Sequence, residues 1–180
     1  MNFYPFPILE TDRLLLRQIT KADAVDIFTI RSDEEVMRYI PRPMAQTIDD
    51  VVLLINMLDD FFAKGERINW GIALKETNQL IGMIGYVNLK EAHFRAEVGY
   101  ALASKFHRQG YMLESLTKVV DYGFSSMKLH SIEATVDAEN VASNALLNHF
   151  GFVKEAYFRE DYYHLNHFRN SIHYGLLKSD

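Results

Sequence analysis

Apolar residues recur along this chain with two different periods, and the period changes near residue 69. Before that point, an apolar run over 14–16 predicts a first strand, and helical spacing predicts helices over 24–31 and 48–64. The early part of the chain is therefore predicted to be a strand followed by two helices.

After residue 69 the pattern is mainly that of strands. The predicted elements are, in chain order, strands over 70–74, 80–87 and 95–102, a helix over 113–127, a strand over 131–136, a helix over 142–150, and strands over 152–158 and 172–177. The first two of these strands are expected to form a hairpin, and the last two an antiparallel pair. The alternation of strand and helix in between indicates crossover connections and mixed pairing.

This order of elements predicts an α/β (α+β) fold built on one central mixed, mostly antiparallel sheet flanked by helices. The 180 residues contain no linker, repeat or low-complexity segment, and this length is typical of one domain. We therefore expect a single domain over residues 1–180.

Composition excludes several classes of protein. The chain has no cysteine, which rules out disulfides, thiolate metal sites and a catalytic thiol. Its net charge of −5 argues against general nucleic-acid binding. It has no apolar run long enough for a membrane span, and no signal peptide is apparent, so a cytoplasmic protein is expected. The histidines His164, His167 and His173 do not have the spacing of a helical metal pair, and no metal is expected.

A basic loop follows the predicted strand over 95–102. It contains Lys105, His107 and Arg108, then Gly110, where the next helix is expected to begin. Free amides and the helix dipole favour an anion at such a position, and glycine allows close approach of the backbone. The segment lacks the Gly-Lys-Ser/Thr of a nucleotide-binding P-loop. An ordinary strand-to-helix turn with incidental charges is the alternative.

Several segments together resemble the GNAT superfamily of N-acetyltransferases, in particular its branch of Rim-type ribosomal-protein-alanine N-acetyltransferases. The matching segments are Glu10 to Arg17, Ala96 to Tyr100, His107 to Leu116, Asn140 to Leu146 with Gly151-Phe152, and the tail from Ala156 to Leu177. The pyrophosphate signature Gln/Arg-x-x-Gly-x-Gly/Ala falls on His107 to Met112. Gly110 is kept, whereas His107 and Met112 depart from the pattern.

The resemblance implies acetyl-CoA as the donor, bound in a cleft between splayed strands. The amides from Arg108 to Met112 would hold the pyrophosphate, with charge from Lys105, His107 or Arg108, and Met112 is bulkier than the usual small residue. The strand Val98 to Leu102 would pair with pantetheine, and Asn140 would contact its arm or serve only as a helix cap. The implied cofactor-binding residues are Val98, Gly99, Tyr100, Ala101, Leu102, His107, Arg108, Gln109, Gly110, Tyr111, Met112, Asn140 and Ser143.

Two residues are predicted to be catalytic. Glu97 matches a glutamate of the family's fourth strand and would act as general base, or would instead be a structural carboxylate paired with Arg95 or Arg17. Many relatives use a tyrosine acid whose register here falls on Leu147. Ser143 matches the serine that replaces it in the Rim-type branch, or would merely bond its own helix backbone.

The acceptor remains open from sequence. A protein N-terminal amine is favoured by the resemblance, while a polyamine, an amino acid or an antibiotic would suit the same fold. We expect the early helices and the C-terminal strands to form the acceptor end. A non-catalytic module that senses acyl-CoA is a further alternative, because of the departures at His107, Met112 and Leu147. Both a monomer and a homodimer are compatible with the sequence.

Overall fold

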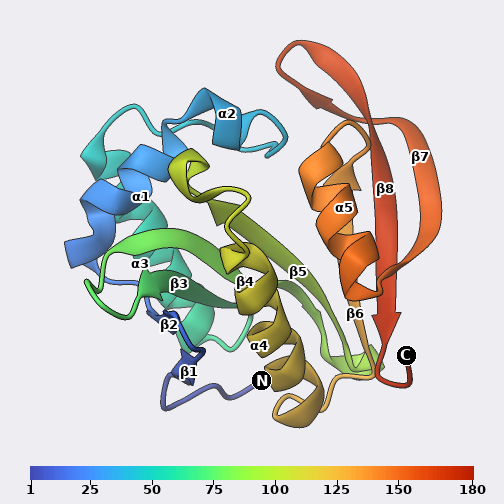
Figure 1. Ribbon diagram of the computed structural model, residues 1–180, viewed down its shortest axis with the longest axis horizontal. Coiled ribbons are helices and arrows are strands. Elements are labelled where there is room, and N and C mark those ends of the chain that lie inside the picture. Colours follow the sequence, from blue (N-terminus) through green and yellow to red (C-terminus); the bar gives the residue numbers. More distant parts are fainter.

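An eight-stranded sheet runs through the molecule in the order β1-β2-β3-β4-β5-β6-β8-β7 (Figure 1), and the computed structural model describes all 180 residues. The strands are β1 (Leu9–Glu10), β2 (Leu14–Gln18), β3 (Ile68–Leu74), β4 (Leu80–Lys90), β5 (Arg95–Leu102), β6 (Ser131–Asp137), β7 (Val153–His164) and β8 (His167–Leu177). Only β5 and β6 are parallel neighbours. The predicted mixed, mostly antiparallel sheet is thus confirmed.

Helices cover both faces of the sheet. They are α1 (Ala24–Arg31), α2 (Glu34–Met37), α3 (Ile48–Ala63), α4 (Tyr111–Ser125) and α5 (Val141–Phe150). The buried Tyr86 of β4 donates its hydroxyl hydrogen to the carbonyl of Val119 in α4, 2.9 Å away, so α4 packs on the face to which Tyr86 points. Helices α4 and α5 both lie in front of the sheet in Figure 1, whereas α1 and α3 contact β4 and β3. None of these helices is long and apolar enough to cross a membrane.

Most predicted elements occur within a few residues of their predicted bounds, and the differences have simple causes. The strands predicted over 152–158 and 172–177 extend to 164 and back to 167, because polar residues continue the pairing of an exposed hairpin. The pattern of apolar residues missed β1 and α2, which contain only two and four residues. Elements this short have too few positions to show a period.

The parallel pair β5 and β6 separates along its length. Arg95 to Glu97 pair with Ser131 to Glu133, and no pairing follows from Val98 onward. The strands diverge toward their carboxyl ends, as Figure 1 shows, while β6 stays paired with β8 up to Asp137. The expected splay is therefore present, and it leaves one edge of residues 98–102 without a neighbouring strand.

Candidate active site

Glu97 lies where the two strands separate. It is the last residue of β5 in register with β6, and its Oε2 accepts a hydrogen bond of 2.6 Å from the side-chain amide of Asn88. Neither predicted arginine partner is available, because Arg95 forms ion pairs with Glu133 and Glu155, and Arg17 pairs with Asp23. The interpretation of Glu97 as half of an arginine ion pair is therefore wrong.

A serine and a tyrosine meet beyond the point of separation. The hydroxyl of Tyr100 on β5 lies 2.6 Å from Oγ of Ser143 on α5, so the pair connects strand and helix across the opening. Burial raises the pKa of Tyr100 to about 12, which keeps its hydroxyl protonated at neutral pH. Ser143 bonds Tyr100 rather than a carbonyl of its own helix, so the alternative of a backbone-bonding helix serine is wrong.

Glu97 and Tyr100 point to opposite faces of the sheet, because successive side chains of a strand alternate. Tyr100 shares the face covered by α4 and α5 and reaches Ser143 there. Glu97 lies on the face of α1 and α3, at the vertex of the opening. A molecule that crosses the sheet between β5 and β6 would meet a carboxylate on one side and hydroxyls on the other.

The first turn of α5 fixes the position of Ser143. Oδ1 of Asn140 accepts a hydrogen bond of 3.1 Å from the backbone amide of Ser143, so Asn140 is the N-cap of this helix. Its side-chain NH₂ group remains for another partner. Leu147, one turn further along, is fully buried in the main core. No side chain at position 147 could therefore reach the opening without repacking the core.

Helix α4 begins without a side-chain cap. Its N-cap, Gly110, has φ +82°, a left-handed conformation that glycine adopts without strain. The guanidinium of Arg13 donates a 3.1 Å hydrogen bond to the carbonyl of Gln109 and stacks on the ring of Tyr111, 4.2 Å from its centroid. The amides of the first turn are thus left for an outside acceptor, and a positive charge lies beside them.

Glu114 anchors Arg13 at this helix end, with an ion-pair distance of 2.7 Å, and also accepts hydrogen bonds from the Arg13 amide and from Thr11. Burial alone would raise the pKa of Glu114, but these hydrogen bonds outweigh it and hold the pKa below its usual value. Arg13 belongs to the segment that resembles the family's opening strand. Sequence reasoning gave it no role at the site, because nearly one hundred residues separate it from the loop.

The side chains of the basic loop are mostly engaged within the protein. Nε2 of His107 lies 2.9 Å from the carbonyl oxygen of Leu102, and Nζ of Lys105 lies over the ring of Phe106. Met112 packs against the core, so its bulk lies on the protein side of the helix. The side chain of Arg108 is exposed. What the loop offers to an anion is therefore mainly backbone amides and the charge of Arg108, because the charge of Arg13 is compensated by Glu114.

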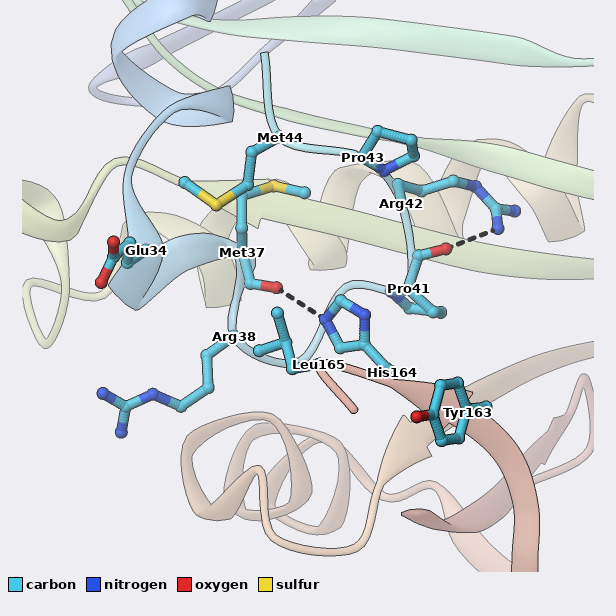
Figure 2. A pocket seen from close by; sticks show the side chains of 10 residues that line it. All are labelled: Glu34, Met37, Arg38, Pro41, Arg42, Pro43, Met44, Tyr163, His164 and Leu165. Carbon is cyan, nitrogen blue, oxygen red and sulfur yellow. Dashed lines mark hydrogen bonds between the residues drawn. The ribbon is translucent and has the colours of Figure 1, made fainter. Parts of the chain in front are cut away.

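A cavity of about 650 Å³ lies between α2 with its following loop and the tip of the β7–β8 hairpin. Figure 2 shows the residues that line it: Glu34, Met37, Arg38, Pro41, Arg42, Pro43, Met44, Tyr163, His164 and Leu165. His164 approaches the carbonyl of Met37 at 3.3 Å, and this contact joins the two walls. Of the aromatic residues in the last third of the chain, Tyr157, Phe158, Tyr163 and Phe168 are all exposed, and of these four Tyr163 lines the cavity.

A buried ionic network ties the hairpin to the end of β6. Asp137 accepts hydrogen bonds from Arg169 of β8 and Tyr162 of β7, and its backbone carbonyl accepts one from Asn144 of α5. Burial alone would raise the pKa of Asp137, but the bonds from Arg169 and Tyr162 outweigh it and lower the pKa. Tyr39 lies under the guanidinium of Arg169, which brings the segment after α2 to the same network.

The family model for the acetyltransferase (GNAT) domain matches residues 13–153, which include the splayed strands and both sets of polar groups. The chain belongs to this family and is an N-acetyltransferase.

Individual relatives agree with this assignment. An uncharacterized N-acetyltransferase of Bacillus subtilis, YoaA, is 43% identical over 88% of this chain and 89% of its own length. The uS5-alanine N-acetyltransferase of Escherichia coli is 26% identical over 84% of this chain and 81% of its own. The fold matches that of RimJ from Mycobacterium smegmatis, solved in complex with CoA-disulfide, with a TM-score of 0.90 at 22% identity, covering 99% of this chain and 91% of that one.

Proposed function

We propose that this enzyme transfers the acetyl group of acetyl-CoA to a protein N-terminal amine, by direct attack in a ternary complex. One observation carries the proposal: at the opening between β5 and β6, Glu97 lies on one face of the sheet and the Tyr100–Ser143 pair on the other. Attack of an amine on a thioester needs a base on the amine side of the carbonyl carbon and a hydrogen-bond donor on the sulfur side. The two faces supply these groups separately.

The residues around α4 and α5 fit a CoA molecule. The uncapped first turn of α4 offers amides to the pyrophosphate, with Gly110 allowing close approach and the exposed Arg108 adding charge. The unpaired edge of Val98 to Leu102 offers backbone groups to the pantetheine amides. Asn140 caps α5 through its Oδ1, and its NH₂ group is left for a pantetheine oxygen. Bound acetyl-CoA supplies an activated acetyl group, and every other step falls to the protein.

The residues at the opening have distinct roles in the reaction. Glu97, oriented by Asn88, takes the proton that the amine loses, through water. Amides of β5 beyond Val98 donate to the carbonyl oxygen as negative charge develops there. The hydroxyl of Ser143 donates to the departing sulfur. A thiolate is a good leaving group, so a hydrogen bond at this position is sufficient and full protonation is not required.

The acceptor is proposed from the cavity and from the relatives. The cavity lies beside α2, which is joined to the cofactor loop by the bond from Ser104 to Asp33, 2.6 Å long, and by the approach of His107 to Glu35. The cavity is open to solvent, which suits the end of a polypeptide. The relative from Escherichia coli named above is an alanine N-acetyltransferase of a ribosomal protein.

The test is release of thiol from acetyl-CoA with a panel of N-terminal peptides, polyamines, amino acids and aminoglycosides. We expect turnover with peptides, and Glu97→Gln is expected to lower kcat by about a hundredfold, which is typical for removal of a general base. Asn88→Ala is the matched control, because it removes the partner of Glu97 and leaves the carboxylate.

The other outcomes are equally informative. Turnover only with a small amine would replace the protein acceptor. CoA binding without any turnover would indicate an acyl-CoA sensor. Full activity in Glu97→Gln would exclude Glu97 as the base.

A further inference from the structure

The tyrosine that many relatives present from the helix is absent here, yet a tyrosine hydroxyl still lies at the opening. The helix register falls on Leu147, which is fully buried and faces the core. Tyr100 comes instead from β5, three residues past the vertex, and its hydroxyl lies 2.6 Å from Oγ of Ser143. The strand therefore brings to the serine a group that the helix does not carry.

Ser143 differs from four hydroxyl residues in or next to helices. Thr29, Ser32, Ser115 and Thr117 each donate their hydroxyl hydrogen to a carbonyl four residues earlier. The carbonyl four residues before Ser143 belongs to Glu139, which lies outside α5, and Ser143 is bonded to Tyr100. A serine hydroxyl has one hydrogen and can direct it to only one acceptor. Its usefulness to a leaving group therefore depends on which oxygen of the pair is the donor.

The surroundings favour Tyr100 as the donor. Burial raises the pKa of Tyr100 to about 12, so its hydrogen is retained at the pH at which the enzyme works. A phenol is also a stronger acid than an aliphatic alcohol, and the stronger acid is the better hydrogen-bond donor. The ring is fixed because it stands on a strand paired with β4, where Tyr100 is in register with Ile84.

We infer that Tyr100 is a positioning residue for departure of the thiol: its hydroxyl donates to Ser143 Oγ and thereby directs the serine's own hydrogen toward the sulfur. This inference depends on the proposed use of acetyl-CoA, and it adds a second hydroxyl to the leaving-group side. Glu97 cannot take this role, because its side chain lies on the other face of the sheet.

The transfer step balances with these groups. The carbon–nitrogen bond forms as the amine attacks, and the amine proton passes through water to Glu97. The carbon–sulfur bond then breaks, and its electron pair goes to the sulfur. Ser143 holds the resulting thiolate by one hydrogen bond, Tyr100 keeps its proton, and the thiolate takes a proton from solvent after release.

The kinetic test is Tyr100→Phe, which removes only the hydroxyl. We expect kcat to fall about tenfold, the effect of one hydrogen bond, with an unchanged KM for acetyl-CoA. The double variant with Ser143→Ala is expected to be no slower than Ser143→Ala alone, because Tyr100 acts only through the serine. Tyr174→Phe is the matched control: its hydroxyl bonds Asn144, the next residue of the same helix, at 2.9 Å.

A second readout needs no acceptor. The pKa of the thiol of bound CoA can be followed by the ultraviolet absorbance of the thiolate. A hydrogen bond to the thiolate lowers this pKa, so Tyr100→Phe and Ser143→Ala are each expected to raise it by about one unit, and Tyr174→Phe to leave it unchanged. A change in thiol pKa without turnover of any amine would refute the proposed function, while it would still show that Tyr100 acts on the sulfur of bound CoA through Ser143.

Three results would overturn the inference. The first is an unchanged thiol pKa in Tyr100→Phe, whatever the turnover. The second is a loss of rate in Tyr100→Phe that adds in full to that of Ser143→Ala. The third is an equal loss in Tyr174→Phe, which would mean that the position of the helix, and not the Tyr100 hydroxyl, is responsible. Circular dichroism of each variant checks that it is folded.

Discussion

Replacement of Asp137 by alanine should destabilise the enzyme strongly. The Asp137 side chain is 1% exposed and that of its partner Arg169 is 13% exposed, so the variant leaves a guanidinium largely buried without its main carboxylate. Removal of one partner of a buried pair typically costs 3 to 5 kcal/mol. Arg169 retains Glu139, which lies 2.9 Å away at the surface, so we expect about 3 kcal/mol, the lower end of that range.

Urea unfolding at neutral pH measures this loss, and Glu139→Ala is the matched control. Glu139 binds the same arginine, but its side chain is 73% exposed, and a pair of this kind contributes about 1 kcal/mol or less. A loss in Asp137→Ala below about 1 kcal/mol, or equal to that in Glu139→Ala, would refute the view that burial makes this pair important.

The pH dependence gives an independent check with a definite sign. The folded state lowers the pKa of Asp137 below its unfolded value of about 3.9. The unfolded chain therefore binds the proton first as the pH falls, and the stabilisation by this carboxylate is complete above about pH 4 and is lost below it. The difference in unfolding free energy between wild type and Asp137→Ala should shrink in acid. A constant difference down to the lowest pH at which the protein folds would contradict this.

Two further substitutions test the site's framework. In Gly110→Ala, the nearest atom to the new Cβ would be Nη2 of Arg13 at 3.4 Å, so there is no severe clash. The left-handed φ should still lower the stability by about 1 to 2 kcal/mol in thermal unfolding, and CoA binding measured by calorimetry should be weaker. An unchanged stability together with unchanged CoA affinity would refute the role of this backbone conformation. Leu147→Tyr should lower the stability by about 1 to 3 kcal/mol because it overpacks the core. Combined with Ser143→Ala, it should not restore activity. Restored turnover would show that a side chain at position 147 can reach the opening.

The sequence was informative about the site wherever local chemistry determines geometry. Gly110 lies at the start of a helix with free amides because a left-handed residue is needed there and the following residues are good helix formers. Asn140 is a cap because its side chain can reach the amide of Ser143 within the same turn. Such features depend on residues a few positions apart, and a pattern in the sequence captures them.

Partners far apart in the chain were beyond the reach of such patterns. Arg13 belongs to the segment that resembles an opening strand, and only the folded chain brings it to the loop before α4. The sequence offers Glu97 two arginines as alternative partners, but both are paired elsewhere and its hydrogen-bond partner is Asn88. Choices among several chemically equivalent partners are made by strand register and helix packing, which no local pattern encodes.

By itself, the sequence determined the order of strands and helices, the mixed sheet and the family, because these follow from periodicity and from motifs of adjacent residues. The tertiary structure alone decided that β5 and β6 separate after Glu97, that Tyr100 reaches Ser143, and that Asp137 holds the hairpin through Arg169. The physical reason is that hydrogen bonds and ion pairs are effective over only a few ångströms. Which groups come within that distance is set by the packing of the whole chain.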